Sequence, residues 1–319
     1  MTPSQPDQST LPLPGTPEGI ARGADLLRSG ALVGFPTETV YGLGVRADDD
    51  AAVARLYAAK GRPSFNPLIV HVPDLAAAGA LVDFTPEAEA LAGAFWPGAL
   101  TLVLPLKRGA PVSPLVTAGL PTLAVRVPAN GLARDLLAAT GLPVAAPSGN
   151  LSGQVSPTRP EHVLAGLSGS IAAVVDGGPC DVGLESTIVG LSAHPVLLRP
   201  GGLPVEAIEA CLGGPLATAA GEGVTAPGQL ASHYAPNGTV RLNATSLEAG
   251  EVLLGFGSVE GAVLNLSPSG DVVEAASRLF SALHELNAMG AERIAVSPIP
   301  DKGLGLAIND RLRRAAAPR

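Results

Sequence analysis

The sequence predicts a layered α/β protein in which a large α/β unit is followed by a smaller one. Between Ala31 and Leu212, short apolar runs alternate with helical patterns, which is typical of a layered α/β domain. The chain has 319 residues, more than one typical domain. Residues 213–235 lose this periodicity and are predicted to be a linker, after which the alternation resumes.

The predicted elements follow from hydrophobic periodicity. In the large unit, strands are expected in the apolar runs that begin at positions 31, 67, 100, 122, 143, 171, 186 and 195, and helices over 50–59, 86–95, 131–140, 160–167 and 204–212. In the small unit, strands are expected over 239–244, 251–256, 262–267 and 293–299, a long helix over 271–290 and a last helix near the C-terminus. The first helix has aspartates at 48–50 before it and Gly61 and Pro63 after it, which are start and stop signals.

Composition and charge restrict the class of protein. Apolar residues make up 46% of the chain but aromatic residues only 3%, so Ala, Leu and Val must build the core. The net charge is −8, and the first 212 residues hold 12 basic and 18 acidic side chains, which argues against strong direct binding of nucleic acid. Residues 1–16 lack the pattern of a signal peptide and are predicted to be a flexible tail. The absence of long apolar runs predicts no membrane span, and two cysteines without a disulfide or zinc pattern favour the cytoplasm.

A polar stretch follows the first predicted strand. The segment "GFPTETVYGLG" puts Thr37, Glu38 and Thr39 at the carboxyl end of that strand, where open α/β sheets bind their ligands. A threonine that caps a turn is the alternative interpretation. The overlapping segment "YGLGVRA" matches a loose dinucleotide-binding pattern, but the predicted helix starts too late for a nicotinamide site.

The segment "KGRPSFNPLIVH" gathers polar groups after a predicted helix. Lys60 and Arg62 could bind an anion, or they could simply end the helix, since cations favour a helix C-terminus. Asn66 adds a polar group that a plain helix end does not need. His71 lies on an apolar strand, where a histidine is more often a core residue than a catalyst. The helix-end position predicts that Lys60→Ala or Arg62→Ala leaves the fold intact, and the anion-site interpretation predicts that either change abolishes function.

Further polar groups follow later strands. Arg126 lies on an apolar strand without an acidic neighbour in sequence, so either an anionic ligand or a structural partner must compensate its charge. The segment "APSGNLSGQVSPT" concentrates hydroxyls and glycines, which suit an anion site or a solvated turn. "GLESTIVG" and "LLRPGG" add Ser186 and Arg199.

The order of these motifs is more specific than any one of them. "PTETVYGLG", "KGRPSFNPLIVH", "WPGALTLVL", "LAVRVP", "APSGNLSG", "ESTIV" and "LLRPG" in succession resemble the YrdC-like family, and within it the threonylcarbamoyl-AMP synthases. The segment "APGQLASHYAP" and the small unit after it resemble the longer, two-domain branch. The resemblance implies a twisted mixed-sheet domain with an open concave cleft, and a smaller Rossmann-like C-terminal domain. The expected division is 1–16 tail, 17–212 catalytic domain, 213–236 linker and lid, and 237–319 small domain.

The resemblance also implies a reaction and its site. Such enzymes join L-threonine, bicarbonate and ATP to threonylcarbamoyl-AMP and pyrophosphate, with Mg²⁺ accompanying ATP and no dedicated metal site. A separate tRNA threonylcarbamoyl transferase then uses the product to modify tRNA next to the anticodon. The implied threonine-binding residues are Thr39, His71, Arg126 and Ser186. The implied ATP-binding residues are Lys60 at the phosphates, Arg62, Asn66, Thr122, Ser148, Asn150, Ser156 and Arg199, with His233 or Tyr234 closing over the nucleotide. Lys60 and Arg62 are the catalytic candidates.

Two other functions are consistent with a YrdC-like domain. One is a non-catalytic RNA-binding module, which the acidic charge of residues 1–212 disfavours. The other is a carbamoyltransferase component of the hydrogenase-maturation type, which would carry zinc-finger-like cysteine pairs that this chain lacks.

Overall fold

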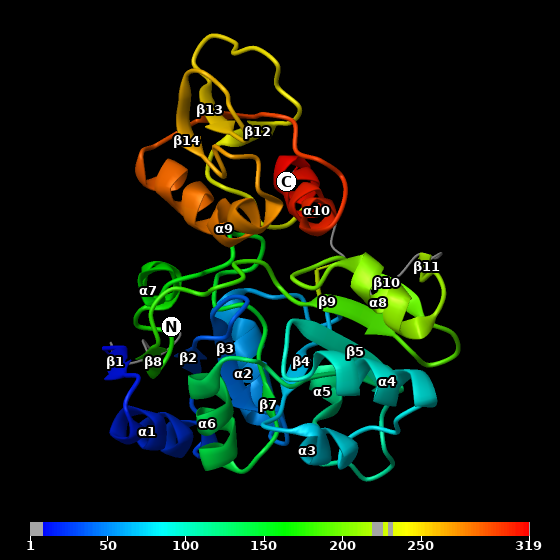
Figure 1. The fold of residues 1–319 in the computed structure, drawn as a ribbon. Coiled ribbons are helices and arrows are strands. Elements are labelled where there is room, and N and C mark those ends of the chain that lie inside the picture. Colours follow the sequence, from blue (N-terminus) through cyan, green and yellow to red (C-terminus); the bar gives the residue numbers. More distant parts are fainter. Residues whose placement is uncertain (1–8, 219–225, 229–231, 319) are drawn as a thin grey trace.

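The computed structural model describes residues 9–218, 226–228 and 232–318. Within them, the strands form an eleven-stranded mixed sheet and a separate four-stranded sheet. Figure 1 shows the small sheet at one end of the molecule, with helices α9 (Val272–Ala288) and α10 (Leu304–Ala316) between it and the part built on the large sheet. The α/β class and the two-part organisation expected from the sequence are confirmed.

The large sheet has the strand order β1-β8-β2-β3-β7-β4-β6-β5-β9-β10-β11. Its strands are β1 Leu11–Pro14, β2 Val33–Phe35, β3 Gly42–Arg46, β4 Ile69–His71, β5 Leu100–Pro105, β6 Thr122–Arg126, β7 Val144–Ala145, β8 Ala173–Asp176, β9 Thr187–Gly190, β10 Val196–Arg199 and β11 Ala217–Thr218. The helices of this part are α1 Pro17–Arg28, α2 Asp50–Lys60, α3 Leu75–Gly79, α4 Pro86–Phe95, α5 Pro114–Thr117, α6 Gly131–Thr140, α7 Pro160–Leu167 and α8 Val205–Leu212.

The register of two central strands places His71 and Arg126 side by side. β4 and β6 are parallel neighbours, and His71 pairs with Arg126 where both strands end. Because the carboxyl ends of parallel strands meet at one sheet edge, ligand-binding groups collect there. The loop after β2 reaches the same place, because its Thr39 receives a hydrogen bond from Arg126.

Helix α2 ends where the sequence signals predict. Asp49 caps its first turn by accepting the Ala52 N–H, and Gly61 adopts the left-handed conformation (φ +57°) that ends it. This ending turns the chain from Lys60 into the loop that leads to β4.

The N-terminal prediction needs a correction. Residues 1–16 were expected to be a flexible tail, but 11–14 form strand β1, which pairs in parallel with β8. Two prolines conceal this strand in the sequence, and a strand at the sheet edge tolerates them because one of its sides needs no ladder hydrogen bonds. Residues 1–8 lie outside the described residues, as do 219–225 and 229–231 of the predicted linker.

The small sheet is parallel, in the order β12-β15-β13-β14. Its strands are β12 Thr239–Arg241, β13 Val252–Gly255, β14 Ala262–Asn265 and β15 Arg293–Val296. Helix α9 buries side chains at positions 275, 276, 279, 280, 283 and 286, a spacing that forms one apolar face.

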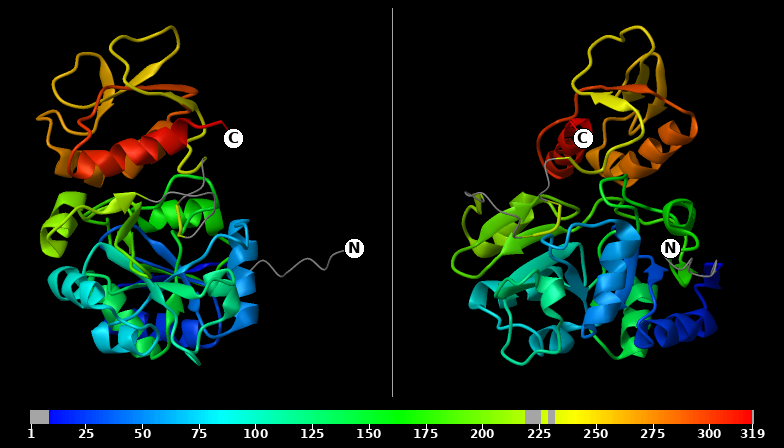
Figure 2. Two further views of the ribbon diagram at one scale, coloured as in Figure 1. Left: turned by 90° about the vertical axis from the view of Figure 1, so that its right-hand side faces the viewer. Right: turned by 180° about the vertical axis from the view of Figure 1, so that it is seen from behind.

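The two parts of the molecule share buried contacts. The apolar cluster beneath α9 and α10 also contains Val40, Leu184 and Tyr234. The rings of His162 on α7 and His284 on α9 stack with centroids 3.8 Å apart, in the region where Figure 2 shows α9 and α10 against the larger part. The small part is therefore packed onto the edge where the polar loops gather. No helix in the described ranges is long and apolar enough to cross a membrane.

Candidate active site

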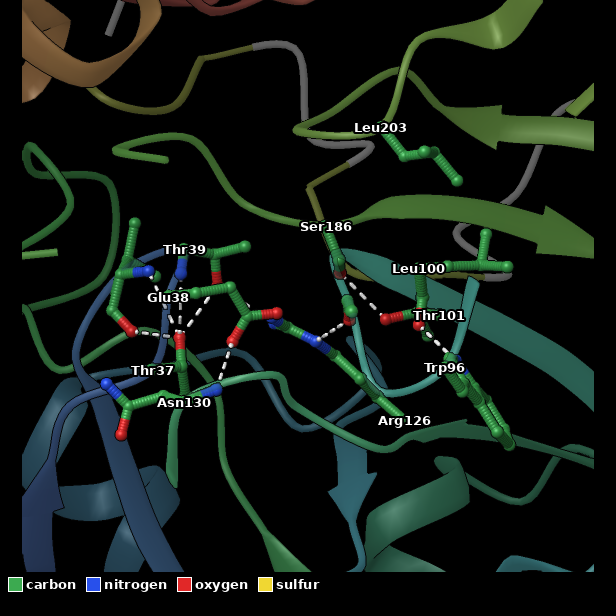
Figure 3. A network of polar contacts seen from close by, with 12 residues as sticks. Thr37, Glu38, Thr39, Trp96, Leu100, Thr101, Arg126, Asn130, Ser186 and Leu203 are labelled. Atoms are coloured by element: carbon green, nitrogen blue, oxygen red, sulfur yellow. Dashed lines mark hydrogen bonds and ion pairs between the residues drawn. The ribbon is translucent and has the colours of Figure 1, made fainter. Parts of the chain in front are cut away.

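The loop after β2 brings two threonine hydroxyls together (Figure 3). Thr37 Oγ1 donates to the Val40 carbonyl oxygen at 2.6 Å and accepts the backbone N–H groups of Thr39 and Val40 at 3.2 Å. Hydroxyl side chains favour such closed turns. The Thr39 hydroxyl, 2.7 Å from that of Thr37, is left pointing toward Arg126, which donates to it from Nη1 at 2.9 Å.

Arg126 has an acidic partner that is distant in sequence. Its Nη2 donates to Glu38 Oε1 at 2.5 Å and its Nε to the Gly98 carbonyl oxygen at 3.1 Å. Burial opposes ionisation of Glu38, but the attraction and hydrogen bond of Arg126 outweigh it, so the pKa of Glu38 lies below its usual value. The sequence left open whether an anionic ligand or a protein group compensates the charge of Arg126. In the structure the protein group Glu38 does so, and the guanidinium of Arg126 still lines the cavity.

Ser186 and Arg199 form a second polar group beside the first. The Ser186 hydroxyl lies 2.7 Å from that of Thr101. Arg199 donates from Nη2 to the Ser186 carbonyl and hydroxyl oxygens at 2.9 and 3.3 Å, and from Nη1 to the Pro227 carbonyl oxygen at 3.3 Å. Arg199 therefore ties the start of β9 to the linker.

His71 is a buried, neutral imidazole. Its Nδ1 donates to the Ile69 carbonyl oxygen at 3.3 Å, and its ring meets Phe35 edge to face. Burial, reinforced by repulsion from Arg126, lowers its pKa to about 3. A group with such a pKa is a poor proton acceptor at neutral pH. His71 can position a ligand but is unsuited to act as a general base.

Lys60 is buried and faces protein carbonyls. Its Nζ donates to the Ser148 carbonyl oxygen at 2.6 Å and also to that of Asn150. Burial, with repulsion from Arg62 added, lowers its pKa well below the usual value. Lys60 thus holds the loop after β7, and its side chain does not line the cavity.

Arg62 and Asn66 lie next to each other after α2. Arg62 lines the cavity and donates to the carbonyl oxygens of Asn66 and Pro67 at 3.3 and 3.0 Å. Burial lowers the pKa of Arg62 to about 10. Among the described residues, neither side-chain polar atom of the fully buried Asn66 has a hydrogen-bond partner. Because buried polar groups are nearly always paired, this amide is expected to contact a ligand or water.

Of the remaining residues that the resemblance implies for ATP binding, one lines the cavity and three do not. Ser148 lines the cavity, whereas Asn150 and Ser156 are buried behind its wall. Asn150 Nδ2 donates to two carbonyl oxygens of its own loop, and Ser156 donates to Glu185. Thr122 begins β6 four residues before Arg126 and faces the same side of the sheet, but it is not a cavity residue.

The end of the linker covers part of the cavity. His233 and Tyr234 line it, and both are buried. The His233 N–H donates to the Arg314 carbonyl oxygen of α10 at 3.2 Å, and the Ala235 N–H donates to that of Gly153 at 2.9 Å. Burial lowers the pKa of His233 to about 3, so its ring is neutral. The linker is held between α10 and the loop after β7.

These groups surround one small cavity. The hollow has about 520 Å³ of empty space, which includes space open to solvent, and about 50 Å³ of it is available to the centres of water-sized molecules. The linker residues Pro227, Gly228, His233 and Tyr234 line this hollow. The cleft expected to be open is thus partly covered here. The polar and charged lining residues are Thr37, Thr39, Arg62, His71, Arg126, Ser148, Glu185, Ser186, Arg199, His233 and Tyr234.

Two important partners were missed in the site predicted from the sequence. Glu38 pairs with Arg126, and Glu185 accepts hydrogen bonds from Ser156 and from Arg311 of α10. Glu38 lies in the motif "PTETVYGLG" and Glu185 in "ESTIV". Their position in polar motifs next to predicted strands was the one feature of the sequence that could have indicated a place in the site. Arg311 gave no signal, because its contact with Glu185 spans 126 positions.

The fold and the cavity together indicate an α/β protein that binds an anionic small molecule. A mixed α/β sheet presents three buried arginines, neutral histidines and hydroxyls to one small hollow, an arrangement suited to an anionic small molecule. The comparisons narrow this class. The Sua5/YciO/YrdC family model described as "Telomere recombination" matches residues 25–201, and the model of the threonylcarbamoyl-AMP synthase C-terminal domain matches residues 203–317.

Whole-length relatives agree with the family models. The chain is 44% identical to the threonylcarbamoyl-AMP synthase of Bacillus subtilis, over 94% of this chain and 93% of the relative. It is 42% identical to that of Pyrococcus abyssi, over 93% and 94%. The crystal structure of P. abyssi Sua5 complexed with L-threonine superposes with a TM-score of 0.89 at 39% identity, covering 96% of this chain and 97% of that one. The chain belongs to the threonylcarbamoyl-AMP synthase family, in its long two-domain form.

Proposed function

We propose that this protein is an L-threonylcarbamoyladenylate synthase, a nucleotidyltransferase that converts L-threonine, bicarbonate and ATP into threonylcarbamoyl-AMP, pyrophosphate and water. The observation that carries the proposal is the cavity itself, in which Arg62, Arg126 and Arg199 lie beside the hydroxyls of Thr39 and Ser186. Family membership over nearly the whole chain supports it. So does the relative whose structure is named as a complex with L-threonine.

The chemistry needs positioned cations more than a proton acceptor. The threonine amine and bicarbonate give an N-carboxylate, whose oxygen attacks the α-phosphorus of ATP while pyrophosphate leaves. This nucleophile is already an anion, so the main obstacle is its repulsion by the triphosphate. Buried guanidinium groups reduce that repulsion. A His71 with a pKa near 3 fits this scheme, because no strong base is required.

The proposed residue roles follow the family resemblance and the placement of each group. Thr39, His71, Arg126 and Ser186 would surround L-threonine at the edge where β4 and β6 end. Arg62, Ser148 and Arg199, which line the cavity, would face ATP. The unpaired amide of Asn66, which is buried and does not line the cavity, would join them. Lys60, Asn150 and Ser156 would shape that site from behind its wall, with Lys60 reaching the phosphates only if its carbonyl partners move. Thr122 would extend the site along β6, and His233 and Tyr234 would close over the nucleotide.

Mg²⁺ would enter with ATP. The two carboxylates nearest the cavity, Glu38 and Glu185, are each paired with an arginine, and the described residues include no group of three or more acidic, histidine or cysteine side chains suited to a metal. With both carboxylates paired, phosphate oxygens would hold the ion. Bound in this way, Mg²⁺ neutralises part of the phosphate charge.

The proposal extends to the domains and the biological setting. The catalytic part would begin at strand β1 rather than at residue 17, and would include α8 and β11, because β11 pairs with β10. Residues up to 236 would form the linker, and 237–319 the small domain. The product would pass to a tRNA threonylcarbamoyl transferase in the cytoplasm. A non-catalytic RNA-binding role is disfavoured because the cavity cations are buried and the net charge is −8.

The test is pyrophosphate release from Mg·ATP. We expect release only when L-threonine and bicarbonate are both present. L-valine, which has the shape of threonine without its hydroxyl, should be a much poorer substrate, because polar groups prepared for that hydroxyl would be left unpaired. Release that continues without any amino acid would contradict the proposed reaction.

A further inference from the structure

Arg311 links the small domain to the cavity. It lies on α10, yet only 1% of its surface is exposed. Its Nε donates to Glu185 Oε2 at 2.8 Å, and its guanidinium carbon lies 5.1 Å from the centre of the Tyr234 ring. Glu185 and Tyr234 both line the cavity. One side chain of the small domain thus contacts two walls of the candidate site.

Glu185 is unexpected in a cavity for a polyanion. A carboxylate there repels phosphate groups unless its charge is compensated, and the low dielectric of a buried site strengthens that repulsion. Ser156 donates to its other oxygen, Oε1, but a hydroxyl brings no charge. Arg311 makes the ion pair with Glu185, while Arg199, also nearby, donates to Ser186 and to the linker.

Burial opposes the ionisation of Glu185, but attraction to Arg311 and then to Arg199 lowers its pKa below the usual value, so Glu185 is charged. Arg311 also keeps one buried donor, Nη2, without a hydrogen-bond partner among the described residues. Asp310, next to it on α10, accepts from Nη1 at 2.6 Å and orients the guanidinium.

We propose that Arg311 is a positioning residue through which the small domain prepares the nucleotide end of the cavity, by compensating the charge of Glu185 and bracing Tyr234. This inference rests on the proposed ATP site. It gives the small domain a defined part in a reaction whose reacting atoms lie in the large domain. Threonine binding should depend on Arg311 far less, because Arg126, Thr39 and His71 are held by other contacts.

The test compares Arg311→Met with Arg313→Met, a matched change at an exposed position two residues further along α10. Calorimetric titration would give the affinities for Mg·ATP and L-threonine separately, without requiring turnover. We expect Arg311→Met to weaken ATP binding at least about tenfold and threonine binding less than about threefold. Arg313→Met should change neither. The double variant Arg311→Met/Glu185→Gln should recover most of the ATP affinity, because no uncompensated carboxylate remains.

Arg311→Gln provides the same test if Arg311→Met does not fold, since it keeps a donor for Glu185 and removes only the charge. A folded variant with unchanged ATP affinity would overturn the proposal. An equal loss of ATP and threonine affinity that Glu185→Gln does not reverse would also overturn it, by showing a merely structural role. If the unmodified protein binds both ligands but releases no threonine-dependent pyrophosphate, the proposed reaction fails while the role of Arg311 in ATP binding is still measured.

Discussion

Lys60 and Arg62 are close neighbours in sequence but have different surroundings in the fold. Gly61 ends α2 between them, so that Lys60 turns inward to two carbonyl groups while Arg62 reaches the cavity. The sequence identified the helix end and the cluster of cations. It could not show which cation is buried, because that depends on the loop after β7, almost 90 positions away.

The burial of Lys60 changes the expected effect of its removal. The helix-end position alone suggested that Lys60→Ala would leave the fold intact. Without the ammonium group, the carbonyl oxygens of Ser148 and Asn150 lose a buried donor, which costs about 1–3 kcal/mol. We therefore expect a lower free energy of unfolding in urea, together with lost turnover. Lys302→Ala, at an exposed lysine, is the control. Unchanged stability of Lys60→Ala would contradict this account of the loop.

The linker packs closely on the cavity wall at Gly228. Gly228 adopts φ +83°, and a Cβ there would lie 2.8 Å from Arg199 Cδ and 2.9 Å from the Tyr234 hydroxyl. Only glycine tolerates both the conformation and the space. The linker can therefore pack against Arg199 in this way only because residue 228 is a glycine.

Gly228→Ala should displace the linker. We expect it to slow pyrophosphate release at least about threefold, a barrier change well within what one strained residue can cause. Gly213→Ala is the matched control, because Gly213 also has positive φ (+72°) but no atom within 4 Å of the place a Cβ would take. If both variants lose the same activity, backbone strain alone explains the loss and the contact with Arg199 and Tyr234 is unimportant.

The interface of α7 and α9 predicts a dependence on pH. Burial, with repulsion from His284 and then Arg159, lowers the pKa of His162 to about 4, and burial also lowers the pKa of His284. In the unfolded chain these histidines bind protons near pH 6.5. Stability from the stack is therefore complete above about pH 6.5 and is lost as the pH falls toward 4. The half-buried position of the stack reduces the size of the effect.

This dependence can be measured in urea unfolding between pH 7.5 and 5. We expect the free energy of unfolding to fall with pH, and to fall less steeply in His162→Gln, whose amide can still accept the Thr158 N–H that His162 Nδ1 accepts now. His194, exposed and far from α9 in sequence, gives the control variant His194→Gln. Equal slopes for His162→Gln and the unmodified protein would show that the stack does not resist protonation.

Prediction from the sequence was most successful where the signal was local. Helix α2 followed from its cap and its glycine, and all eight strands predicted in the large part contain an observed strand. Strand β3 was missed because Gly42 and Gly44 are unusual in strands. Helix α1 and the short helices α3 and α5 were also missed. The pairs Glu38 with Arg126 and Glu185 with Arg311 could not be predicted, since packing of distant segments creates them.

At the scale of the whole molecule, the small domain packs behind the wall of the cavity that the large domain and the linker form. Its helix α10 supplies Arg311, which contacts the lining residues Glu185 and Tyr234, and a carbonyl group that holds the linker, while α9 packs beside α7. The two-domain form therefore has a structural reason, because linker and cavity wall are held from both sides.

The proposed reaction is tested most directly by following the carbon of bicarbonate into the product. Threonylcarbamoyl-AMP contains that carbon, whereas a simple threonyl adenylate does not, although both reactions release pyrophosphate. The protein would be incubated with Mg·ATP, L-threonine and ¹³C-bicarbonate, and the adenylate analysed by mass spectrometry. We expect a threonine-dependent adenylate that carries the label in its carbamoyl group. An unlabelled threonyl adenylate, or AMP formed without threonine, would contradict the proposed reaction.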